Sequence, residues 1–502
     1  MKAKRTWLLP VALLVVVMAG CTGTLEVGIE RTPTPDLAPA ATIAALSADN
    51  DRLATRVASQ VTPTPMPLNM GRLAYVQGGD IWIKTLPSGT SLRLTTDGHN
   101  KDPHWSPSGD WLAFRKDRQI IVDQEVPCEN QKLRAQICTE SVTVLQRQVW
   151  VIDVNSGGTH PLYEGASVDA FAWSPVDDRL AYSTATVGLS MINADGTGLV
   201  TLVSQAPPDR SSPGRVGRFA WNPDGASLAY EWRSPVSEQS TYEGLWKVSV
   251  ESKAQVELYD SGLPKQGEAI LAGWAPLGTR VLFWQSETPY APLTDGAPLY
   301  AVNVDKEQSK GTLPVRLGAD DSVLNYDDFV VPAPAHVDSG VRDAVAVVMG
   351  ANRSTWRNKR IELAGRELSP KGLAAISPAW SPDGARLAYV AMPDRPEVGS
   401  VELARQELMQ RRIWVANAAG EPQPQRLTNT AAYRDEHPLW SADGNYLLFA
   451  RVDAKGRASL WIMAADGSTS RQVVDELTPA PDPFLSYGHV DWAAWLDWWR
   501  GM

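Results

Sequence analysis

Several residue types and motifs are scarce in this chain of 502 residues, and their scarcity excludes some classes of protein. The chain has three cysteines and six histidines, and no Gly-x-Ser-x-Gly sequence occurs in it. Without this nucleophile elbow, nothing indicates a serine hydrolase of the α/β type. Only two cysteines follow the N-terminal segment, whereas a structural zinc site needs four ligands, so cysteine spacing does not support structural zinc.

The chain also has no excess of positive charge. Its net charge is −10, and it becomes −13 when the three basic residues of the N-terminal segment are left out. Because no basic stripe is present to neutralise phosphates, we do not expect nucleic acid as a partner. After residue 21, no apolar run is long enough to span a bilayer.

The first 20 residues have the pattern of a signal peptide. Lys2, Lys4 and Arg5 precede an apolar run over residues 7–18, which is too short to cross a membrane. The run ends in Ala-Gly-Cys21, which resembles the bacterial lipobox and implies cleavage before Cys21 and lipid modification of that residue. The alternative is an ordinary secretory signal with an incidental cysteine. We therefore expect an extracytoplasmic lipoprotein, held on the membrane at the cell surface or in the periplasm.

Residues 21–69 are predicted to form a tether rich in proline and threonine, with a short helix at about residues 40–60. The helix carries a heptad-like series: Ile43, Leu46, Asn50, Leu53 and Val57. A core asparagine is typical of a parallel coiled-coil dimer. With fewer than three heptads, an isolated amphipathic spacer helix is the favoured interpretation.

The remaining residues, 70–502, are organised around a recurring phrase, Trp-Ser-Pro-x-Gly-x-x-Leu-Ala-Phe. The best copies begin at Trp105, Trp221 and Trp380, and weaker copies begin at Trp173, Trp274 and Trp440. Pro-Asp-Gly is turn chemistry, so each phrase predicts a strand, a turn and a second strand. A third strand with an Ile-Trp or Leu-Trp pair and a fourth strand follow, and four short strands per repeat predict the blade of a β-propeller.

The spacing of the repeats predicts eight blades. The gap between Trp274 and Trp380 is about twice the others, so a degenerate blade is expected at about residues 331–366. The first blade lacks an inner strand, and residues 490–495 are predicted to supply it, which closes the ring with both ends of the domain. Seven blades is the alternative, if the degenerate unit is a long insertion.

The repeated phrase resembles the WD40-like (PD40) repeat of the TolB propeller family over about residues 72–496. This resemblance implies an all-β propeller fold, but propellers host binding, scaffolding and catalysis, so it does not specify a function. TolB proteins carry an α/β domain before the propeller, where this chain has only a tether. Some lyases with this repeat hold a metal through histidines.

Two cysteines, Cys128 and Cys138, lie ten residues apart in an insertion of the second repeat. In an oxidising compartment this proximity predicts a disulfide bond.

Three histidines precede inner strands, at offsets that predict one strand face: His104, His437 and His489. Ring closure would bring them together with nearby acids at the mouth of the central channel. The candidate ligand-binding residues are Asp102, His104, Glu436, His437, His489 and Asp491. The favoured interpretation is a polar channel mouth without a cofactor, and the alternative is a divalent metal held by the three histidines.

These expectations favour a lipid-anchored binding or scaffold module of the cell envelope, with a protein or peptide partner. The alternative function is a metal-dependent lyase or hydrolase that acts on a polysaccharide at the histidine cluster. No catalytic residue is assigned, and the oligomeric state is left open.

Overall fold

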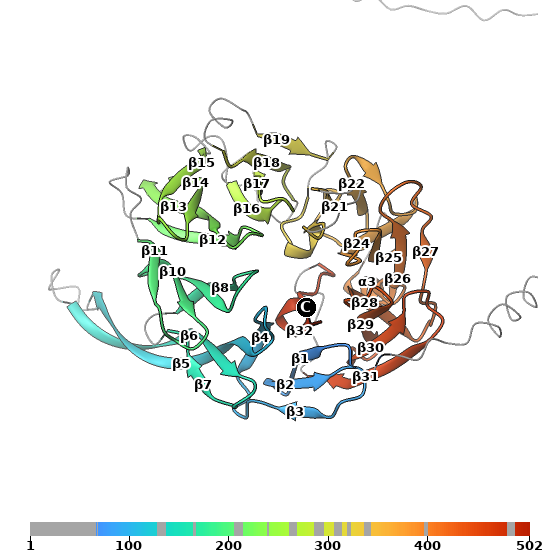
Figure 1. The fold of residues 1–502 in the computed structure, drawn as a ribbon, viewed down its shortest axis with the longest axis horizontal. Helices are drawn as coiled ribbons and strands as arrows, with labels where there is room; N and C mark the ends of the chain where they lie inside the picture. Colours follow the sequence, from blue (N-terminus) through green and yellow to red (C-terminus); the bar gives the residue numbers. More distant parts are fainter. Residues whose placement is uncertain are drawn as a thin grey trace, which may run out of the picture. The chain divides into compact units, whose positions relative to one another are not determined.

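The computed structural model describes residues 67, 69–127, 137–163, 167–204, 214–237, 240–260, 269–285, 296–305, 314–318, 323–335, 343–395, 400–478 and 487–501. Residues 1–65 lie outside these ranges. Eight four-stranded antiparallel sheets are arranged around a central axis, which confirms the predicted eight-bladed β-propeller (Figure 1). We number the blades 1–8 in chain order.

Blade 1 contains β1 (Arg72–Gln77), β2 (Asp80–Thr85), β3 (Ser91–Arg93) and β32 (Leu496–Trp499). Blade 2 contains β4 (Asn100–Trp105), β5 (Trp111–Pro127), β6 (Ile137–Asp153) and β7 (Thr159–Pro161). Blade 3 contains β8 (Val168–Trp173), β9 (Arg179–Thr184), β10 (Gly188–Asn193) and β11 (Val200–Val203). Blade 4 contains β12 (Arg215–Trp221), β13 (Ser227–Ser237), β14 (Ser240–Ser249) and β15 (Gln255–Asp260).

Blade 5 contains β16 (Ala269–Trp274), β17 (Arg280–Gln285), β18 (Leu299–Asn303) and β19 (Val315–Leu317). Blade 6 contains β20 (Val330–Pro332), β21 (Val345–Met349), β22 (Arg360–Leu363) and β23 (Arg366–Glu367). Blade 7 contains β24 (Leu373–Trp380), β25 (Arg386–Pro393), β26 (Arg412–Asn417) and β27 (Gln425–Arg426). Blade 8 contains β28 (Tyr433–Trp440), β29 (Tyr446–Asp453), β30 (Ala458–Ala464) and β31 (Ser470–Leu477). The described helices are η2 (Asp327–Phe329), α3 (Val401–Leu408) and η4 (Trp492–Ala494).

The turn of the repeated phrase adopts the conformation that its residues predict. In blade 7, Gly384 has a φ of +66° and donates its backbone N–H to the carbonyl oxygen of Ser381 at 2.9 Å. The Asp383 carboxylate accepts hydrogen bonds from the Ser381 hydroxyl and from the backbone N–H of Ala385. Glycine tolerates the positive φ and aspartate caps the turn, so this sequence sets the hairpin between the first two strands.

The tryptophan of the phrase ties five of the blades to the preceding blade. At five interfaces its indole Nε1–H donates to the carbonyl oxygen of the residue before the corresponding position in the preceding blade. The pairs are Trp173 to His104 at 2.9 Å, and Trp221 to Ala172, Trp274 to Ala220, Trp380 to Val331 and Trp440 to Ala379, each at 3.0 Å. We call this contact the tryptophan clamp. It satisfies the polar end of a large apolar side chain that fills the wedge between blades.

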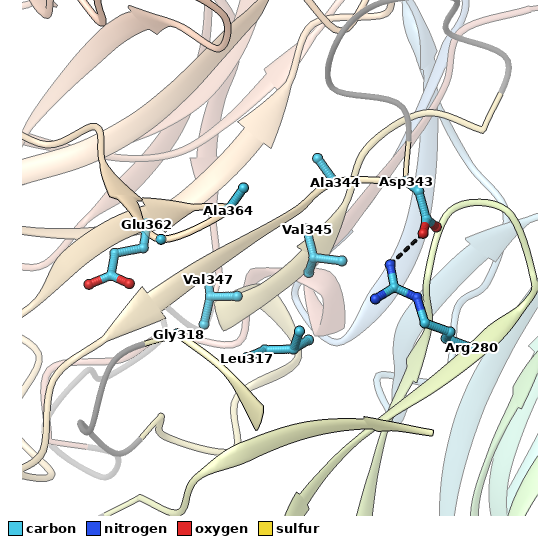
Figure 2. A pocket seen from close by; sticks show the side chains of 10 residues that line it. Arg280, Leu317, Gly318, Asp343, Ala344, Val345, Val347, Glu362 and Ala364 are labelled. Atoms are coloured by element: carbon cyan, nitrogen blue, oxygen red, sulfur yellow. Dashed lines mark hydrogen bonds and ion pairs between the residues drawn. The ribbon is translucent and has the colours of Figure 1, made fainter. Parts of the chain in front are cut away.

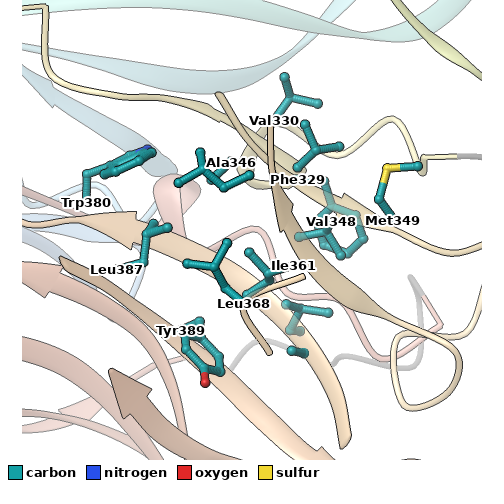
Figure 3. Close-up of a cluster of buried hydrophobic side chains, with 14 of the residues drawn as sticks. Phe329, Val330, Ala346, Val348, Met349, Ile361, Leu368, Trp380, Leu387 and Tyr389 are labelled. Atoms are coloured by element: carbon teal, nitrogen blue, oxygen red, sulfur yellow. The ribbon is translucent and has the colours of Figure 1, made fainter. Parts of the chain in front are cut away.

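The core is a series of apolar clusters between neighbouring blades. The largest cluster includes buried side chains of the degenerate blade 6, among them Val348 and Ile361, packed with Leu387 and Tyr389 of blade 7 (Figure 3). The unit predicted at residues 331–366 is therefore a blade, although it has lost its tryptophan.

The C-terminus closes the ring, as predicted, but through a strand that lies later in the chain. β32 (Leu496–Trp499) pairs antiparallel with β1, with Leu73 opposite Trp498. The predicted strand at 490–495 is wrong, because η4 interrupts these residues, which cross the channel instead. Leu496 and Trp498 then bury alternate side chains in the core beside Tyr75.

Candidate functional site

The centre of the ring is crossed by residues 487–495, which precede the closing strand (Figure 1). Three blades hold this segment through hydrogen bonds. The backbone N–H of Thr355 in blade 6 donates to the carbonyl oxygen of Tyr487 at 3.0 Å, and the backbone N–H of Val76 in blade 1 donates to that of Trp495 at 2.9 Å. From blade 8, Glu436 Oε2 accepts the indole N–H of Trp492 at 2.9 Å. We call residues 487–495 the crossing segment.

A cavity of about 280 Å³ lies against the crossing segment at the channel mouth. Its walls combine Tyr326 and Asp328 from the turn η2 before blade 6, His437 from β28, and His489, Asp491 and Trp492 from the crossing segment. Arg218 of β12 also lines it. Residues far apart in the sequence thus meet here, and aromatic rings alternate with carboxylates.

His489 is fixed in the wall by a ring and a carboxylate. Its imidazole stacks on Tyr326, with ring centroids 3.8 Å apart and an interplanar angle of 4°. Its Nε2 lies 2.7 Å from Asp328 Oδ1, and Ser377 Oγ donates to Asp328 Oδ2 at 2.7 Å. Burial opposes ionisation of Asp328, but His489 and Ser377 outweigh it, so the pKa of Asp328 lies below its usual range.

His437 has a different environment in the same cavity. It occupies a bulge of β28 with a φ of +54°, and its ring lies 6.4 Å from that of Trp492. Burial disfavours the charged imidazolium and lowers the pKa of His437 to about 4, although nearby carboxylates oppose this shift. His437 is therefore neutral at pH 7.

Glu436, which the sequence placed at the channel mouth, is buried beneath it. Its Oε1 accepts a hydrogen bond from Arg411 Nη1 at 2.8 Å, and both side chains are almost fully buried. Burial alone would raise the pKa of Glu436, but Arg411 and Arg434 hold it below its usual range. A buried pair of this kind is costly to break, so Glu436 anchors the crossing segment through Trp492 rather than facing a ligand.

Asp102 and His104 form a separate pair on blade 2, outside the lining of the cavity. His104 Nε2 lies 3.0 Å from Asp102 Oδ1, and Arg115 Nε lies 3.4 Å from Asp102 Oδ2. Burial opposes protonation of His104, but the carboxylate of Asp102 prevails and raises its pKa. The three histidines predicted as one cluster thus fall into two groups.

A repeated bulge explains why the strand-face argument failed. Asp102, Ser377 and His437 each lie three residues before the tryptophan of their repeat, and each has a positive φ between +52° and +59°. The strand pairing shifts at these positions, so the alternation of faces is broken there. An offset of one and an offset of three therefore do not share a face.

The mouth carries an excess of acidic groups. Burial together with the carboxylates of Asp102, Asp327 and Asp328 raises the pKa of Asp491, although His489 opposes the shift. Arg218 offsets part of this charge through an ion pair with Asp327 at 2.9 Å. A ligand with positive charge or several N–H donors would suit this surface best.

A metal does not fit the arrangement. Among the described residues, no group of three or more histidine, cysteine, aspartate or glutamate side chains is close enough to hold an ion. His489 and His104 are each held by their own aspartate. We therefore derive no chemistry through a metal.

Three residues that line the cavity were not predicted from the sequence: Tyr326, Asp328 and Arg218. The first two precede the degenerate blade, where the repeated phrase is absent, and they lie on an irregular turn. Arg218 lies three residues before Trp221, at the bulge position of blade 4, so the repeat itself offered a signal that was overlooked.

Several predicted features lie outside the described residues: the signal peptide, Cys21, the heptad series and Cys128. The backbone of Cys138 belongs to β6, opposite Val126. In the part of the chain that the structure describes, no helix has the length and apolarity needed to cross a membrane.

No protein-family model and no curated protein sequence matches the chain. Among solved structures, it is similar to the dihydro-heme d1 dehydrogenase NirN, with a TM-score of 0.52 and 12% identity over 83% of this chain and 78% of that one. An oligogalacturonate lyase in complex with manganese gives a TM-score of 0.40 and 14% identity over 81% and 86% of the two chains. TolB from Acinetobacter baumannii gives 0.34 and 12% over 82% and 66%. At these identities the likeness shows the propeller fold alone.

Proposed function

We propose that this protein is an extracytoplasmic binding module, anchored to the membrane through lipid on Cys21, which captures a protein or peptide segment at the channel mouth. The observation that carries the proposal is the cavity of about 280 Å³ beside the crossing segment. It presents aromatic faces, carboxylates and a neutral imidazole on a rigid frame. Propellers place recognition on such surfaces, where loops meet a fixed scaffold.

The chemistry of the mouth favours a basic ligand segment. Asp491 is accessible to solvent, although its surroundings partly desolvate its carboxylate, and Asp327 and Asp328 lie in the same wall, so a lysine or arginine side chain would gain charge-assisted hydrogen bonds. Tyr326 and Trp492 would pack against its aliphatic stem. Basic residues in the captured segment are therefore part of the proposal.

Affinity capture from membranes with the lipidated protein tests this function. We expect Asp491→Asn combined with Tyr326→Ala to lose most of the captured partner, because these changes remove a charge and an aromatic wall. Glu251→Gln, an exposed carboxylate in the turn after β14, serves as the matched control and should capture as the parent does. Equal capture by all three proteins would refute the site.

The anchor has its own test. Cys21→Ser should move the protein from the membrane fraction to the soluble fraction. If the variant stays on the membrane, the proposed lipid anchor does not account for membrane association.

The alternative that the sequence left open is a metal-dependent lyase or hydrolase acting on polysaccharide, although the described residues form no metal site. Burial lowers the pKa of His437 to about 4, so its imidazole would be neutral at pH 7, as a metal ligand must be. Metal analysis of the purified protein separates the two candidates. Stoichiometric metal that is lost in His437→Ala would favour the enzyme, whereas capture of a partner without metal favours the binding module.

A further inference from the structure

A second cavity, of about 180 Å³, lies between blades 5 and 6, away from the channel mouth (Figure 2). Leu317 and Gly318 of blade 5 face Val345, Val347 and Glu362 of blade 6 across it. The close-up shows the valines along its centre, with Glu362 on one side and the Arg280–Asp343 pair on the other. The cavity is thus apolar in the middle and charged at two ends.

The cavity is lined by residues of blade 6 that stand where five other blades have a pair of aromatic residues. In five blades, a phenylalanine or tyrosine of the second strand is paired with a tryptophan of the third strand. The pairs are Tyr75 with Trp82, Phe114 with Trp150, Tyr230 with Trp246, Tyr389 with Trp414 and Phe449 with Trp461. In blade 6 the equivalent pair is Val347 with Glu362. A carboxylate therefore stands where the repeat has an indole.

The first strand of blade 6 is reduced as well. Val331 accepts the clamp hydrogen bond from Trp380, so Pro332 takes the position that a tryptophan has in the repeated phrase. Blade 7 shows what is missing: Arg386, the first residue of its second strand, lies over the ring of Trp440 in the next blade, 4.5 Å from the centroid. Arg280 holds the equivalent position in blade 5. The next blade offers it Pro332 in place of a tryptophan ring, and Arg280 pairs with Asp343 instead.

Glu362 is left with unmet hydrogen-bonding capacity. The residue is 7% exposed, and its Oε1 accepts a hydrogen bond from Arg360 Nε at 2.9 Å. Its Oε2 is buried and has no hydrogen-bond partner among the described residues. This oxygen borders the cavity wall, because a Cβ placed on Gly318 would lie 3.7 Å from it. Buried polar atoms without partners are rare in native proteins, and a ligand that donates to this oxygen would satisfy it.

We propose that the cavity between blades 5 and 6 binds an aromatic ring that carries an N–H donor, of the indole type. The ring lies against Val345 and Val347, where five other blades place their own aromatic pair, and its N–H donates to Glu362 Oε2. The size is suitable, since an engineered apolar cavity of about 150 Å³ in another protein binds benzene. The guanidinium of Arg280 borders the cavity, as that of Arg386 lies over the ring of Trp440 between blades 7 and 8.

The test is calorimetric titration of the full chain with indole and with indene, which has the same shape but no N–H. We expect indole to bind about tenfold more tightly than indene, because a hydrogen bond to a carboxylate is worth about that factor. In Glu362→Leu, indole and indene should bind with about equal affinity. Glu362→Trp, which restores the residue that five other blades have, should abolish binding of both probes while the protein stays folded. Glu251→Gln, the exposed carboxylate in the turn after β14, should bind as the parent does.

Two results would overturn the site. One is no binding of indole to the parent protein up to the solubility limit of the probe. The other is unchanged binding in Glu362→Trp. The ratio of the affinities of the parent protein for indole and indene needs no variant, so the proposal stays testable if a substitution prevents folding. N-acetyltryptophan amide separates the sources: binding as tight as that of indole assigns the site to a tryptophan side chain of a partner, and binding of indole alone assigns it to a free small molecule.

Discussion

The repeat places a tryptophan at the interface between blades 7 and 8 and at the interface between blades 1 and 2. The hydrogen bonding of this tryptophan differs between the two interfaces. Between blades 7 and 8, Trp440 donates its indole N–H to Ala379, and Arg386 covers its ring. Between blades 1 and 2, the indole nitrogen of Trp105 is buried and has no hydrogen-bond partner among the described residues.

The closing strand replaces the missing clamp. Asp497 of β32 accepts the backbone N–H of Trp105 at 2.8 Å, and Trp499 donates its indole N–H to the carbonyl oxygen of Pro107 at 2.9 Å. Arg72 lies 5.1 Å from the ring centroid of Trp105 and 4.8 Å from that of Trp499. The ordinary interfaces are thus joined by one repeated contact, whereas the closing interface depends on a strand from the other end of the domain. The same closure brings the crossing segment into the channel.

The largest effect is expected from removing that strand. Deletion of residues 488–502 should abolish cooperative unfolding, because it exposes the edge of β1 and removes the buried side chains of Trp492, Leu496 and Trp498. Deletion of residues 501–502 alone is the control and should leave the transition unchanged. Denaturant unfolding followed by near-UV circular dichroism measures both. A truncated protein as stable and monomeric as the parent would contradict ring closure.

A pair of matched substitutions compares the contribution of the tryptophan to stability at the two interfaces. Trp440→Phe leaves the carbonyl oxygen of Ala379 without its donor, whereas Trp105→Phe removes an indole nitrogen that has no partner. Trp440→Phe should therefore destabilise the protein by about 1–2 kcal/mol more than Trp105→Phe. Equal shifts in the denaturant midpoint would show that the clamp contributes little.

An effect of pH on stability is expected at the crossing segment. The pKa of His437 is about 4 in the folded protein, below the value of about 6.5 expected when the chain is unfolded. The unfolded chain then binds more protons between these pH values, so the contribution of His437 to stability is complete above about pH 6.5 and is lost as the pH falls towards 4. His437→Gln should flatten the stability profile in this window, and the exposed His99→Gln should not.

The smallest effect on stability concerns the predicted disulfide. Free-thiol labelling of the purified protein without reductant should find neither Cys128 nor Cys138, and reduction should shift the unfolding midpoint little, because the bond would close a loop of only about ten residues. Labelling of both thiols would contradict the bond.

Much of the fold was predictable because the repeated phrase encodes both its turn and its wedge-filling side chain. Even the blade without a tryptophan was found, since the spacing between Trp274 and Trp380 left room for one more unit. The closing strand was predicted too early, because residues 490–495 and 496–499 are both rich in tryptophan and nothing local distinguishes the crossing segment from a strand.

The candidate site was less predictable. His437, His489 and Asp491 do line the cavity, but Glu436 is buried with Arg411, and Asp102 and His104 belong to blade 2. The bulge three residues before the tryptophan changes which side chains face the channel, and a strict alternation of faces cannot anticipate it. Tyr326 and Asp328 reach the cavity from an irregular turn, for which the repeat gives no register.

The crossing segment and β32, which lie within residues 487–502, complete the ring and the channel mouth together. The most direct measurement adds a synthetic peptide of these residues to the protein lacking 488–502 and follows near-UV circular dichroism during unfolding. We expect that the peptide restores a cooperative transition, and that the same peptide with Trp492, Leu496 and Trp498 replaced by alanine does not. Equal restoration by the two peptides, or no response to either, would contradict it.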